Sequence, residues 1–387
     1  MNGFAPDAPA RLLVVDDVPA NCELLARRLK RLGHEVAIAE DGIRALESLR
    51  GGEFDLVLLD ITMPGMDGYQ VLETMKTDEA LRHVPVVMVS AIDESESVVR
   101  CLELGADDYL PKPFDPAVLR ARVESSLARK RLRDAERRQL QAIARELEIG
   151  RRIQSGFLPE SLPRLDGWDI GARFLPARQV AGDFYDVFPV GDGIALVVAD
   201  VCDKGVGAAL YMALFRSLIR AIATQQPDAD AHATLARTAR ATSDYIATVH
   251  GSSNMFATAF VAVLDPRSGE LAYVNAGHDA PLHARAGGAV ERLGTTGPAL
   301  GILPGQRFGI GATRIEPGDL LLAFTDGVTD AGTPAAPFGE AGILARIAQR
   351  QGAVDGLLDQ VVAGIEAFGD ELPDDVTMLA IGRAVAA

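Results

Sequence analysis

Charged and hydroxyl side chains stand at the ends of four short apolar runs between residues 11 and 117. Asp16 and Asp17 follow Leu12–Val15, Asp60 follows Leu56–Leu59, Ser90 ends Val84–Ser90, and Lys112 follows Tyr109–Leu110. Three carboxylates placed together repel one another unless a divalent cation binds between them. A lysine and a hydroxyl beside them supply the positive charge and the hydrogen-bond donor that a phosphoryl group needs. Acidic caps of strand–helix turns explain one such residue, but not the matched set.

A second set of acids borders apolar runs in the later part of the chain. Asp183 and Asp186 follow Val180–Gly182, Asp200 follows Ala195–Ala199, Asp326 follows Leu320–Thr325, and Asp374 and Asp375 precede Val376–Ile381. No pair of histidines has ligand spacing, and no Ser-His-Asp set accompanies these acids. A site of carboxylates alone suits hard divalent metals that activate a water, and two such ions can stabilise both oxygens of a phosphoryl transfer. Each Asp taken alone is more typical of a capped turn, whereas the set favours metal binding.

The first set needs a fold that brings the ends of the runs to one edge. Between the strand-like runs lie stretches with helical spacing, such as Leu25/Leu29/Leu32 and Leu72/Met75. Strands that alternate with helices predict a doubly wound parallel sheet, on which ligands bind beyond the carboxyl ends of the strands. We therefore expect an α/β domain of five parallel strands, with the polar side chains along one edge.

The second set lies in a stretch with a different pattern. Strand-like runs outnumber helical ones, and hairpin-length turns such as residues 265–269 join consecutive runs. The runs are Trp168–Phe174, Ile194–Val201, Phe256–Leu264, Leu271–Asn275 and Leu320–Thr325. Clear helical spacing occurs at Tyr211–Ile222, Gly342–Ile347 and Val354–Ala367. This pattern predicts an α+β domain of antiparallel sheets flanked by helices.

Composition and charge narrow the class of protein. The 387 residues suit two or three domains, and 48% hydrophobic and 24% charged residues are typical of a soluble globular protein. No apolar run reaches the ~20 residues of a membrane span, and we recognise no signal peptide. Three separated cysteines without a CxxC motif exclude a disulfide framework and a structural zinc site, and favour a reducing cytoplasm. A net charge of −16 argues against general nucleic-acid binding.

A basic segment separates the two acidic regions. Residues 118–152 carry 11 basic and 5 acidic side chains, and no Gly or Pro occurs between Ala117 and Ile149. The pattern of apolar residues predicts a long helix with a thin apolar stripe, which needs a partner to be stable. The apolar residues are Leu119, Val123, Leu127, Leu132, Leu140, Ile143, Leu147, Ile153 and Phe157. We favour a parallel dimer helix, a coiled coil, that carries a signal between the domains. A solvated linker helix is the alternative, and a membrane-surface role is disfavoured because glutamates interrupt the basic face.

The first domain resembles the receiver domain of two-component response regulators. The resemblance covers residues 10–125 and rests on Val14–Asp17, Leu58–Gly68, Ser90-Ala91, Gly105–Tyr109 and Lys112–Phe114. It implies a flavodoxin-like sheet of strand order 2-1-3-4-5 and phosphorylation of Asp60 by a sensor histidine kinase. It also implies that Asp17, Asp60 and the Thr62 carbonyl bind Mg²⁺ with Asp16 acting through water, that Lys112 and Ser90 contact the phosphate, and that Tyr109 turns inward as a switch.

The second domain resembles the metal-dependent phosphatases of the PP2C (PPM) superfamily, in particular the SpoIIE/RsbU-like bacterial branch. The motifs span residues 150–383 and are Ile153–Pro159, Val180–Asp186, Ala199–Leu210, Met255–Thr258, Tyr273–His278, Gly297–Gly301, Phe324–Ala331 and Asp374–Thr377. The resemblance implies a β-sandwich flanked by helices, with a site for two Mn²⁺ or Mg²⁺ ions. Asp200 would bridge both ions, the Val201 carbonyl would bind one of them, Asp326 and Asp374 would hold the other, and Asp183 would bind directly or through water.

Cys202 is a departure from this family, which usually has Ser at that position. A nucleophilic cysteine would need a phosphate-binding loop that follows it and ends in Arg, and no such loop follows Cys202. Many eukaryotic relatives have a His at this same position as general acid, so the leaving-group acid is left unassigned.

These patterns predict three parts: a receiver domain at residues 1–117, a helical, dimerising linker at 118–158, and a PP2C-like domain at 159–387. We expect a cytoplasmic response regulator, homodimeric through linker and receiver, in which phosphorylation of Asp60 controls a protein serine/threonine phosphatase. Family resemblance implies that the substrate is a phosphorylated anti-sigma-factor antagonist in a partner-switching pathway. The alternative is a non-enzymatic adaptor on a dead phosphatase fold, which would have no reason to retain Asp183, Asp200, Asp326 and Asp374. A diguanylate-type output lacks any matching glycine–acid signature.

Overall fold

The computed structural model describes residues 9–91, 95–226, 230–333, 336–350, 352–369 and 372–385. The chain forms two compact units, Met1–Ile143 and Ala144–Ala387. Each unit has its own sheets and its own hydrophobic cores, so each is described by itself.

The first unit is built on a five-stranded parallel sheet of order β2-β1-β3-β4-β5. Its strands are β1 (Arg11–Val15), β2 (Glu35–Ala39), β3 (Leu56–Asp60), β4 (Val86–Ser90) and β5 (Asp108–Pro111). Its helices are α1 (Pro19–Arg31), α2 (Gly42–Gly51), α3 (Gly68–Thr77), α4 (Ser95–Glu103) and the start of α5 (Pro116–Ser155). The predicted doubly wound sheet and its strand order are confirmed.

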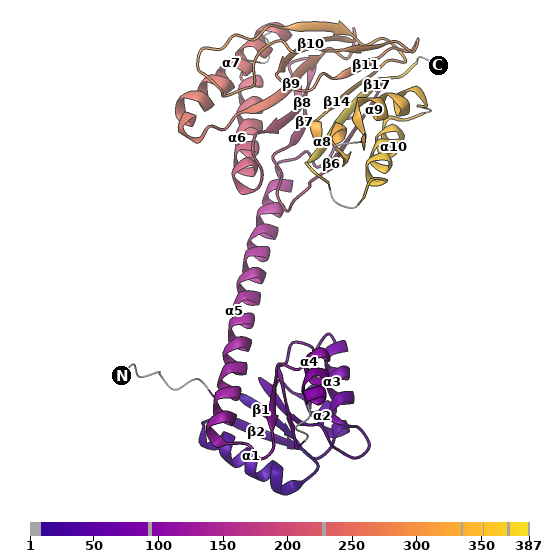
Figure 1. Cartoon of the computed structure of the whole chain (residues 1–387). Helices are drawn as coiled ribbons and strands as arrows, with labels where there is room; N and C mark the ends of the chain where they lie inside the picture. The colour runs from indigo at the N-terminus through magenta and orange to yellow at the C-terminus, as the bar shows by residue number, and fades with distance from the viewer. Residues whose placement is uncertain are drawn as a thin grey trace. The chain divides into compact units, whose positions relative to one another are not determined.

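Helices cover both faces of this sheet (Figure 1). Alternate residues of β1 point to opposite sides: Leu13 and Val15 pack against α2, α3 and α4, whereas Leu12 and Val14 pack against α1 and α5. Because both faces are buried, the strands are almost continuously apolar, as is typical of parallel sheets. The polar side chains of the first set therefore lie at the strand ends, where the apolar runs stop.

Helix α5 begins in the core of the first unit. Leu119, Val123 and Leu127 are buried against the sheet, so these apolar positions of the basic segment serve the receiver core. Lys130 Nζ lies 3.1 Å from Asp55 Oδ1. Arg133 Nη2 lies 2.8 Å from Asp107 Oδ1. These ion pairs extend the contact between α5 and the receiver beyond the apolar residues.

The second unit contains two five-stranded antiparallel sheets, of order β13-β10-β9-β8-β7 and β12-β11-β14-β17-β6. The first sheet comprises β7 (Phe184–Val190), β8 (Gly193–Val201), β9 (Ala257–Leu264), β10 (Glu270–Ala276) and β13 (Gly311–Arg314). The second comprises β6 (Trp168–Leu175), β11 (Leu282–Ala284), β12 (Val290–Arg292), β14 (Leu320–Phe324) and β17 (Val376–Arg383). A short pair, β15 (Gly332–Thr333) and β16 (Ala336–Pro337), lies apart from both sheets.

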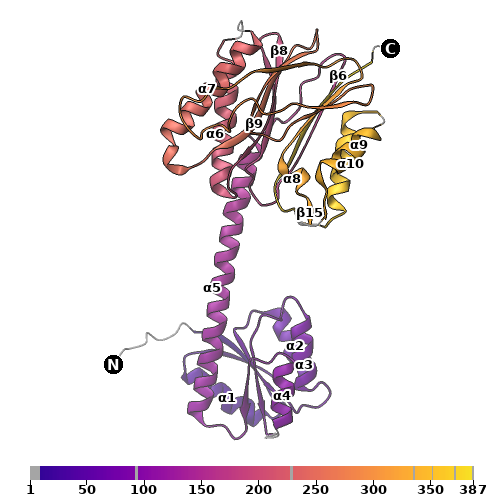
Figure 2. The same cartoon turned by 45° about the horizontal axis from the view of Figure 1, so that its top comes forward.

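Helices flank the two packed sheets, which gives four layers (Figures 1 and 2). Side chains such as Phe260, Leu321 and Leu379 fill the space between the sheets. Helices α6 (Val206–Ala223) and α7 (Ala231–Val249) cover the first sheet, and α9 (Gly339–Ala348) and α10 (Val354–Glu366) cover the second. A short 3₁₀ helix, η1 (Gly251–Ser253), and a one-turn helix, α8 (Asp326–Thr329), complete the unit. The predicted α+β sandwich is confirmed.

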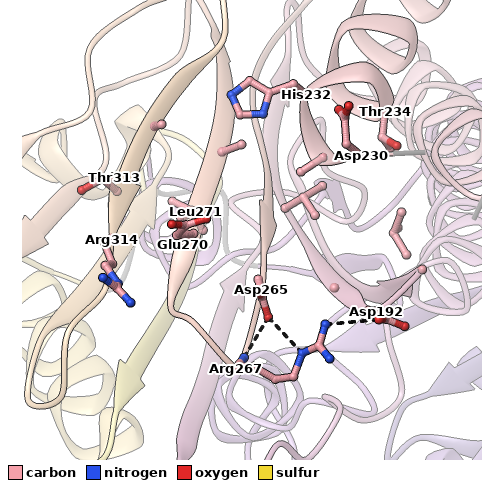
Figure 3. Close-up of a pocket in the computed structure, with 17 residues that line it drawn as sticks. Asp192, Asp230, His232, Thr234, Asp265, Arg267, Glu270, Leu271, Thr313 and Arg314 are labelled. Carbon is pink, nitrogen blue, oxygen red and sulfur yellow. Dashed lines mark hydrogen bonds and ion pairs between the residues drawn. The ribbon is translucent and has the colours of Figure 1, made fainter. Parts of the chain in front are cut away.

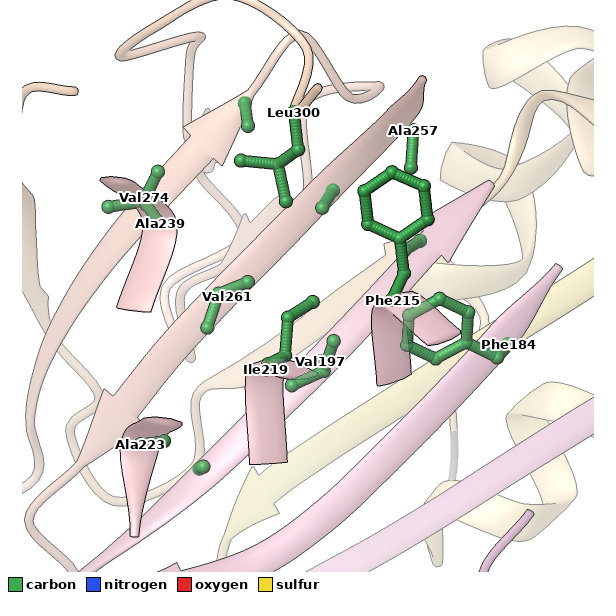
Figure 4. Close-up of a cluster of buried hydrophobic side chains, with 14 of the residues drawn as sticks. Phe184, Val197, Phe215, Ile219, Ala223, Ala239, Ala257, Val261, Val274 and Leu300 are labelled. Carbon is green, nitrogen blue, oxygen red and sulfur yellow. The ribbon is translucent and has the colours of Figure 1, made fainter. Parts of the chain in front are cut away.

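Helix α6 packs on the first sheet through large apolar side chains. Phe215 and Ile219 meet Phe184 and Val197 of the sheet in one buried cluster (Figure 4). Within the described residues, α6 is the helix whose length and apolar composition would also allow it to cross a membrane. Its buried face is instead part of a hydrophobic core, as is common for the central helix of a packed domain.

Candidate functional site

The first acidic site lies at the carboxyl ends of β1 and β3. Carboxylate oxygens of Asp16, Asp17 and Asp60 all lie within 4.8 Å of one another. Lys112 follows β5, and its Nζ lies 2.7 Å from Asp16 Oδ2 and 2.9 Å from Asp60 Oδ1. The structure therefore brings together the three acids and the lysine that the sequence singled out.

Charge at this site is only partly balanced. Burial raises the pKa of Asp60 above its ordinary value, although Lys112 acts in the opposite direction. Burial also works against the Lys112 ammonium, but its hydrogen bonds with Asp16 and Asp60 prevail and raise its pKa. Because one lysine faces three carboxylates, the donor set is of the type that binds a divalent cation through oxygen.

The other residues predicted for this site differ in their positions. Ser90 is buried at the end of β4, and Tyr109 is buried in β5. Thr62 is exposed in the loop after β3. Gly68 packs so closely on the Asp60 carbonyl that a Cβ there would collide with it, so the loop that carries Thr62 can fold back only over a glycine.

The second acidic site lies where the two sheets of the second unit meet α8. Asp183 precedes β7, Asp200 lies near the end of β8, Asp326 opens α8 and Asp374 precedes β17. Hydrogen bonds between strands place Asp200 opposite Thr258 of β9. The structure thus assembles at one site four acids that are up to 191 residues apart in the sequence.

These acids are neighbours in the folded unit, and the charge of each one affects the pKa of the next. Burial, followed by the carboxylate of Asp200, raises the pKa of Asp183 well above its ordinary value. Burial and the carboxylate of Asp326 raise the pKa of Asp200 to about 7. Asp326 is itself exposed, but the surrounding loops reduce its hydration, and this together with Asp374 and Asp279 raises its pKa. Repulsion of this kind is what bound cations relieve, so the donor set fits divalent metal ions.

The spacing of the second site differs from that of the first. Among the described residues, Asp16, Asp17 and Asp60 form the group of three acids whose oxygens all approach within 4.8 Å. The acids of the second unit are more widely spread. Asp374 Oδ2 lies 2.7 Å from Lys204 Nζ, a contact that the sequence did not indicate.

Hydrogen bonds within the second unit hold the loops that carry these acids. Thr325 donates its hydroxyl to Asp183 Oδ2 at 2.6 Å. Asp375 accepts the backbone N–H groups of Ala177 and Gly182, each at 2.8 Å. Asp375 therefore ties down the loop before Asp183, whereas its neighbour Asp374 faces the site.

The last turn of α5 also reaches this loop. Gln154 is buried, and its side-chain amide both donates to the Ala181 carbonyl at 2.6 Å and accepts the Ala181 N–H at 3.0 Å. Ala181 is two residues from Asp183. The end of the long helix is thus attached to the backbone that positions one acid of the site.

Val201 and Cys202 follow Asp200 directly. Gly182 lies against the Val201 carbonyl, since a Cβ there would come within 2.9 Å of the oxygen. Cys202 is half-buried, and its sulfur accepts the Phe256 N–H at 3.2 Å. Burial raises the pKa of the Cys202 thiol, so this side chain is held in its neutral, weakly nucleophilic form.

Asp186 does not belong to the acidic site, although the sequence grouped it with Asp183. It is buried beneath α6, where Arg220 binds it through two hydrogen bonds of 2.9 and 2.6 Å. Arg216 Nη2 lies 3.2 Å away on the same helix. Asp186 therefore joins β7 to α6 as a buried ion pair.

Replacement of Asp186 by Asn should destabilise the second unit by about 3 kcal/mol, because it leaves two arginines without their buried counter-ion. Trp168, the single tryptophan of the chain, lies in β6 and reports unfolding of this unit by fluorescence. The control is Asp192→Asn, which removes an exposed ion pair with Arg267 and should shift the urea midpoint little. Equal midpoints for the two variants would refute the structural role of Asp186.

A cavity of about 560 Å³ lies at the opposite end of the first sheet (Figure 3). Its walls include the β7–β8 turn, the start of α7 and the β9–β10 turn. Arg267 there contacts Asp192 and Asp265 in exposed ion pairs. Strand β8 runs from this cavity towards Asp200, and none of the four acids of the second site lines the cavity.

Comparisons with known proteins agree with the two folds. Residues 12–124 match the family model described as response regulator receiver domain. Residues 191–384, half of the chain, match the family described as Stage II sporulation protein E (SpoIIE).

Curated relatives match parts of the chain. Protein IcfG of Synechocystis sp. is 41% identical over 264 residues, which is 62% of this chain and 41% of that protein. Response regulator PleD of Caulobacter vibrioides is 43% identical over 166 residues, 43% of this chain and 34% of PleD. The chain thus spans about two fifths of the length of IcfG and a third of PleD.

Two solved structures resemble the second unit. The RsbU and RsbW domains of Rv1364c from Mycobacterium tuberculosis are 30% identical with a TM-score of 0.50, over 59% of this chain and 64% of that one. The SiaA-PP2C domain of Pseudomonas aeruginosa is 22% identical with a TM-score of 0.54, over 64% and 99%, and supports the fold alone. With the two family matches, these findings lead to one conclusion: the chain belongs to the SpoIIE family, and a response regulator receiver domain precedes its SpoIIE domain.

Proposed function

We propose that the chain is a metal-dependent protein serine/threonine phosphatase controlled by phosphorylation of Asp60. The proposal rests on the four acids of the second site, Asp183, Asp200, Asp326 and Asp374. The pKa values of the first three are raised. Buried carboxylates that repel one another weaken a fold, so their presence together is explained by cations that they bind.

In this proposal two Mn²⁺ or Mg²⁺ ions bind at the second site. Asp200 and the Val201 carbonyl would help to hold the ions, Asp326 and Asp374 would hold the second of them, and Asp183 would bind directly or through water. When bound, the ions supply a water of lowered pKa and neutralise charge on the phosphoryl group. The chain itself orients the ligands: Thr325 holds the Asp183 carboxylate, and Asp375 fixes the backbone before it.

The receiver supplies the control. A sensor histidine kinase is the expected phosphodonor for Asp60. Asp17, Asp60 and the Thr62 carbonyl would hold Mg²⁺, with Asp16 acting through water. Lys112 Nζ lies 2.9 Å from Asp60 Oδ1. Phosphorylation adds about 1.5–2 negative charges at this edge, to which the switch residues Ser90 and Tyr109 respond.

The linker is the proposed route between the sites. We assign the receiver to residues 1–117, the linker to 118–158 and the phosphatase domain to 159–387. The start of the linker packs on the receiver through Leu119, Val123 and Leu127. In the single chain Leu132, Leu140 and Ile143 of α5 are exposed. At ~100° per residue they and Leu147 lie within about 80° of one another around the helix. Such a stripe suits a coiled-coil homodimer, while Gln154 connects the far end of the helix to Ala181.

The proposed substrate is a phosphoserine or phosphothreonine on an anti-sigma-factor antagonist, in a cytoplasmic partner-switching pathway. Likeness to the RsbU domain of Rv1364c and to the SpoIIE family supports this choice. No membrane or nucleic-acid partner is part of the proposal.

The test measures phosphate release by the full chain from a phosphoserine protein of the antagonist class, with and without Mn²⁺ and with and without a small phosphodonor. We expect Mn²⁺-dependent release whose rate changes with the phosphodonor, and no such change in Asp60→Asn. No release under any condition, with retained binding of the phosphoprotein, would instead establish the non-enzymatic adaptor.

Cys202→Ser should retain activity within about twofold of the wild type, because the neutral thiol beside Asp200 is not the proposed nucleophile. Initial rates on a generic phosphate ester check this expectation. Loss of activity in a folded Cys202→Ser protein, together with a phosphocysteine detected by mass spectrometry in the wild type, would replace the metal mechanism by a thiol mechanism.

A further inference from the structure

Lys204 is the one lysine among residues 131–387, where every other strongly basic side chain is an arginine. It lies in the loop that connects β8, which carries Asp200, to α6. The loop is tightly turned: Asp203 has a φ of 74° and Gly205 a φ of 83°. Asp203 also accepts the Lys204 N–H at 2.8 Å. A non-glycine residue in the left-handed region is uncommon, so the direction of Lys204 is fixed by an unusual backbone.

The turn directs Lys204 towards the start of β17. Its Nζ lies 2.7 Å from Asp374 Oδ2 and donates to the Pro373 carbonyl at 3.0 Å. Asp374 uses its other oxygen to accept the Asp375 N–H at 2.9 Å. Both oxygens of Asp374 are therefore engaged, and one of them is engaged by a positive charge.

The other acids of the site differ in this respect. Asp183, Asp200 and Asp326 form no ion pair with a lysine or arginine in the part of the chain that the structure describes. Lys204 thus places one positive charge beside Asp374, a residue proposed to hold the second metal ion.

The side-chain type suits this place. A lysine ammonium is a compact charge on a flexible stem, whereas an arginine guanidinium is a planar fork that prefers paired acceptors. The receiver uses the same type of side chain in the same way, with Lys112 between Asp16 and Asp60. Both acidic sites of the chain therefore hold a lysine where a cation would be attracted.

We propose that Lys204 is a positioning residue that competes with the second metal ion for Asp374. In the metal-free protein its ammonium balances the Asp374 carboxylate, and it leaves that oxygen when the ion binds. Lys204 therefore lowers metal affinity at this side of the site and keeps Asp374 oriented before the ion arrives. The inference rests on the proposed two-metal site.

The test compares Mn²⁺ binding by full-length wild type, Lys204→Met and Lys204→Arg, measured from the free Mn²⁺ signal in electron paramagnetic resonance. The receiver site is common to all three proteins and cancels in the comparison. Lys204→Met should bind the more weakly held phosphatase ion about fivefold more tightly, as expected for loss of a partly exposed ion pair. Lys204→Arg keeps the positive charge on which the competition depends, so its Mn²⁺ affinity should lie closer to that of the wild type than that of Lys204→Met does.

Arg267→Met is the matched control, since it removes one positive charge from the same domain in the exposed turn beside the far cavity. It should leave Mn²⁺ affinity unchanged. Unchanged or weaker binding by Lys204→Met, in a protein with wild-type circular dichroism, would overturn the inference while leaving the metal site in place. Wild-type protein that binds no Mn²⁺ beyond the receiver site would overturn the inference and the proposed function together.

Acylation of Lys204 in the wild-type protein provides a second test, which needs no variant. Two oxygens hold its ammonium, so an amine-reactive reagent should modify Lys204 faster if Mn²⁺ displaces it from Asp374. Peptide mapping is unambiguous because no other lysine follows residue 130. A rate that Mn²⁺ leaves unchanged, or slows, would contradict displacement of Lys204.

Discussion

Asp200→Asn and Asp326→Asn should each lower Mn²⁺-dependent hydrolysis by at least about 10³-fold, equivalent to ~4 kcal/mol in the activation barrier. Each variant removes one negative charge from a set that must balance two divalent cations. Asp200 is the central member, because Asp326 and burial together raise its pKa to about 7. Initial rates on a generic phosphate ester, measured over a range of Mn²⁺ concentrations, give the result.

A separate measurement shows that the loss is not caused by unfolding. In the folded chain without bound metal, the pKa of Asp200 is raised to about 7, compared with 3.8 for an ordinary Asp. Because the folded chain binds this proton more tightly than the unfolded chain does, Asp200 contributes to the free energy of unfolding in full below pH 4. This contribution is lost as the pH rises through 7. In EDTA at pH 8, Asp200→Asn should therefore melt at a higher temperature than the wild type.

Asp192→Asn is the control for both measurements, because Asp192 lies at the far end of the same sheet in an exposed turn. It should change neither the rate nor the melting temperature. Near-wild-type turnover by either Asp200→Asn or Asp326→Asn would show that the metal assignment is wrong.

Insertion of two residues after Glu136 should uncouple the phosphatase rate from phosphorylation of Asp60, whereas insertion of seven should largely preserve coupling. Glu136 is exposed and follows the ion pairs that Lys130 and Arg133 form with the receiver. Two residues turn the downstream helix by about 200°, while seven nearly restore its phase. A helix that transmits rotation is sensitive to this difference, and a flexible tether is not.

The measurement is the initial rate on the phosphoprotein with and without phosphodonor for both insertions. Gln154→Leu serves as a companion variant, because it removes both hydrogen bonds to Ala181 without changing the helix phase. It should also weaken the response to the phosphodonor. Equal responses by the two insertions would make the segment a passive tether, and regulation would then need direct contact between the domains.

The receiver could be predicted almost completely from the sequence, for a physical reason. Its central strands β1, β3 and β4 are buried on both faces, so they are continuous apolar runs, and β3 and β4 end at polar residues, Asp60 and Ser90. Ligand chemistry on such sheets lies at those ends. The periodicity therefore locates both the fold and the site.

Helix α7 shows where the same method fails. Its buried face consists largely of small or hydroxyl side chains, with Thr234, Thr238, Thr242 and Ser243 among them. These residues carry little hydrophobic signal, so a 19-residue helix produced no clear apolar period. The short strands β11, β12 and β13 were missed because three or four residues are too few to show alternation.

The contacts that organise the second acidic site could not be predicted from sequence, because they join distant segments. Thr325 and Asp183 are 142 residues apart, and Lys204 and the Pro373 carbonyl 169. Asp186 shows the converse error, since an acid three residues from a site acid proved to be an ion-pair partner of α6. Sequence spacing indicates which residues are candidates, whereas only the folded backbone shows which of them meet.

The hydrogen bonds of Gln154 have a consequence for how such proteins diversify. The glutamine binds the main-chain N–H and carbonyl of Ala181, so these two hydrogen bonds do not depend on the side chain at that position. A different input module that ends in a helix with glutamine at this register would offer the loop the same two hydrogen bonds. We therefore expect that exchange of the module before Gln154 changes the signal to which the protein responds without a change in the sequence of the second unit.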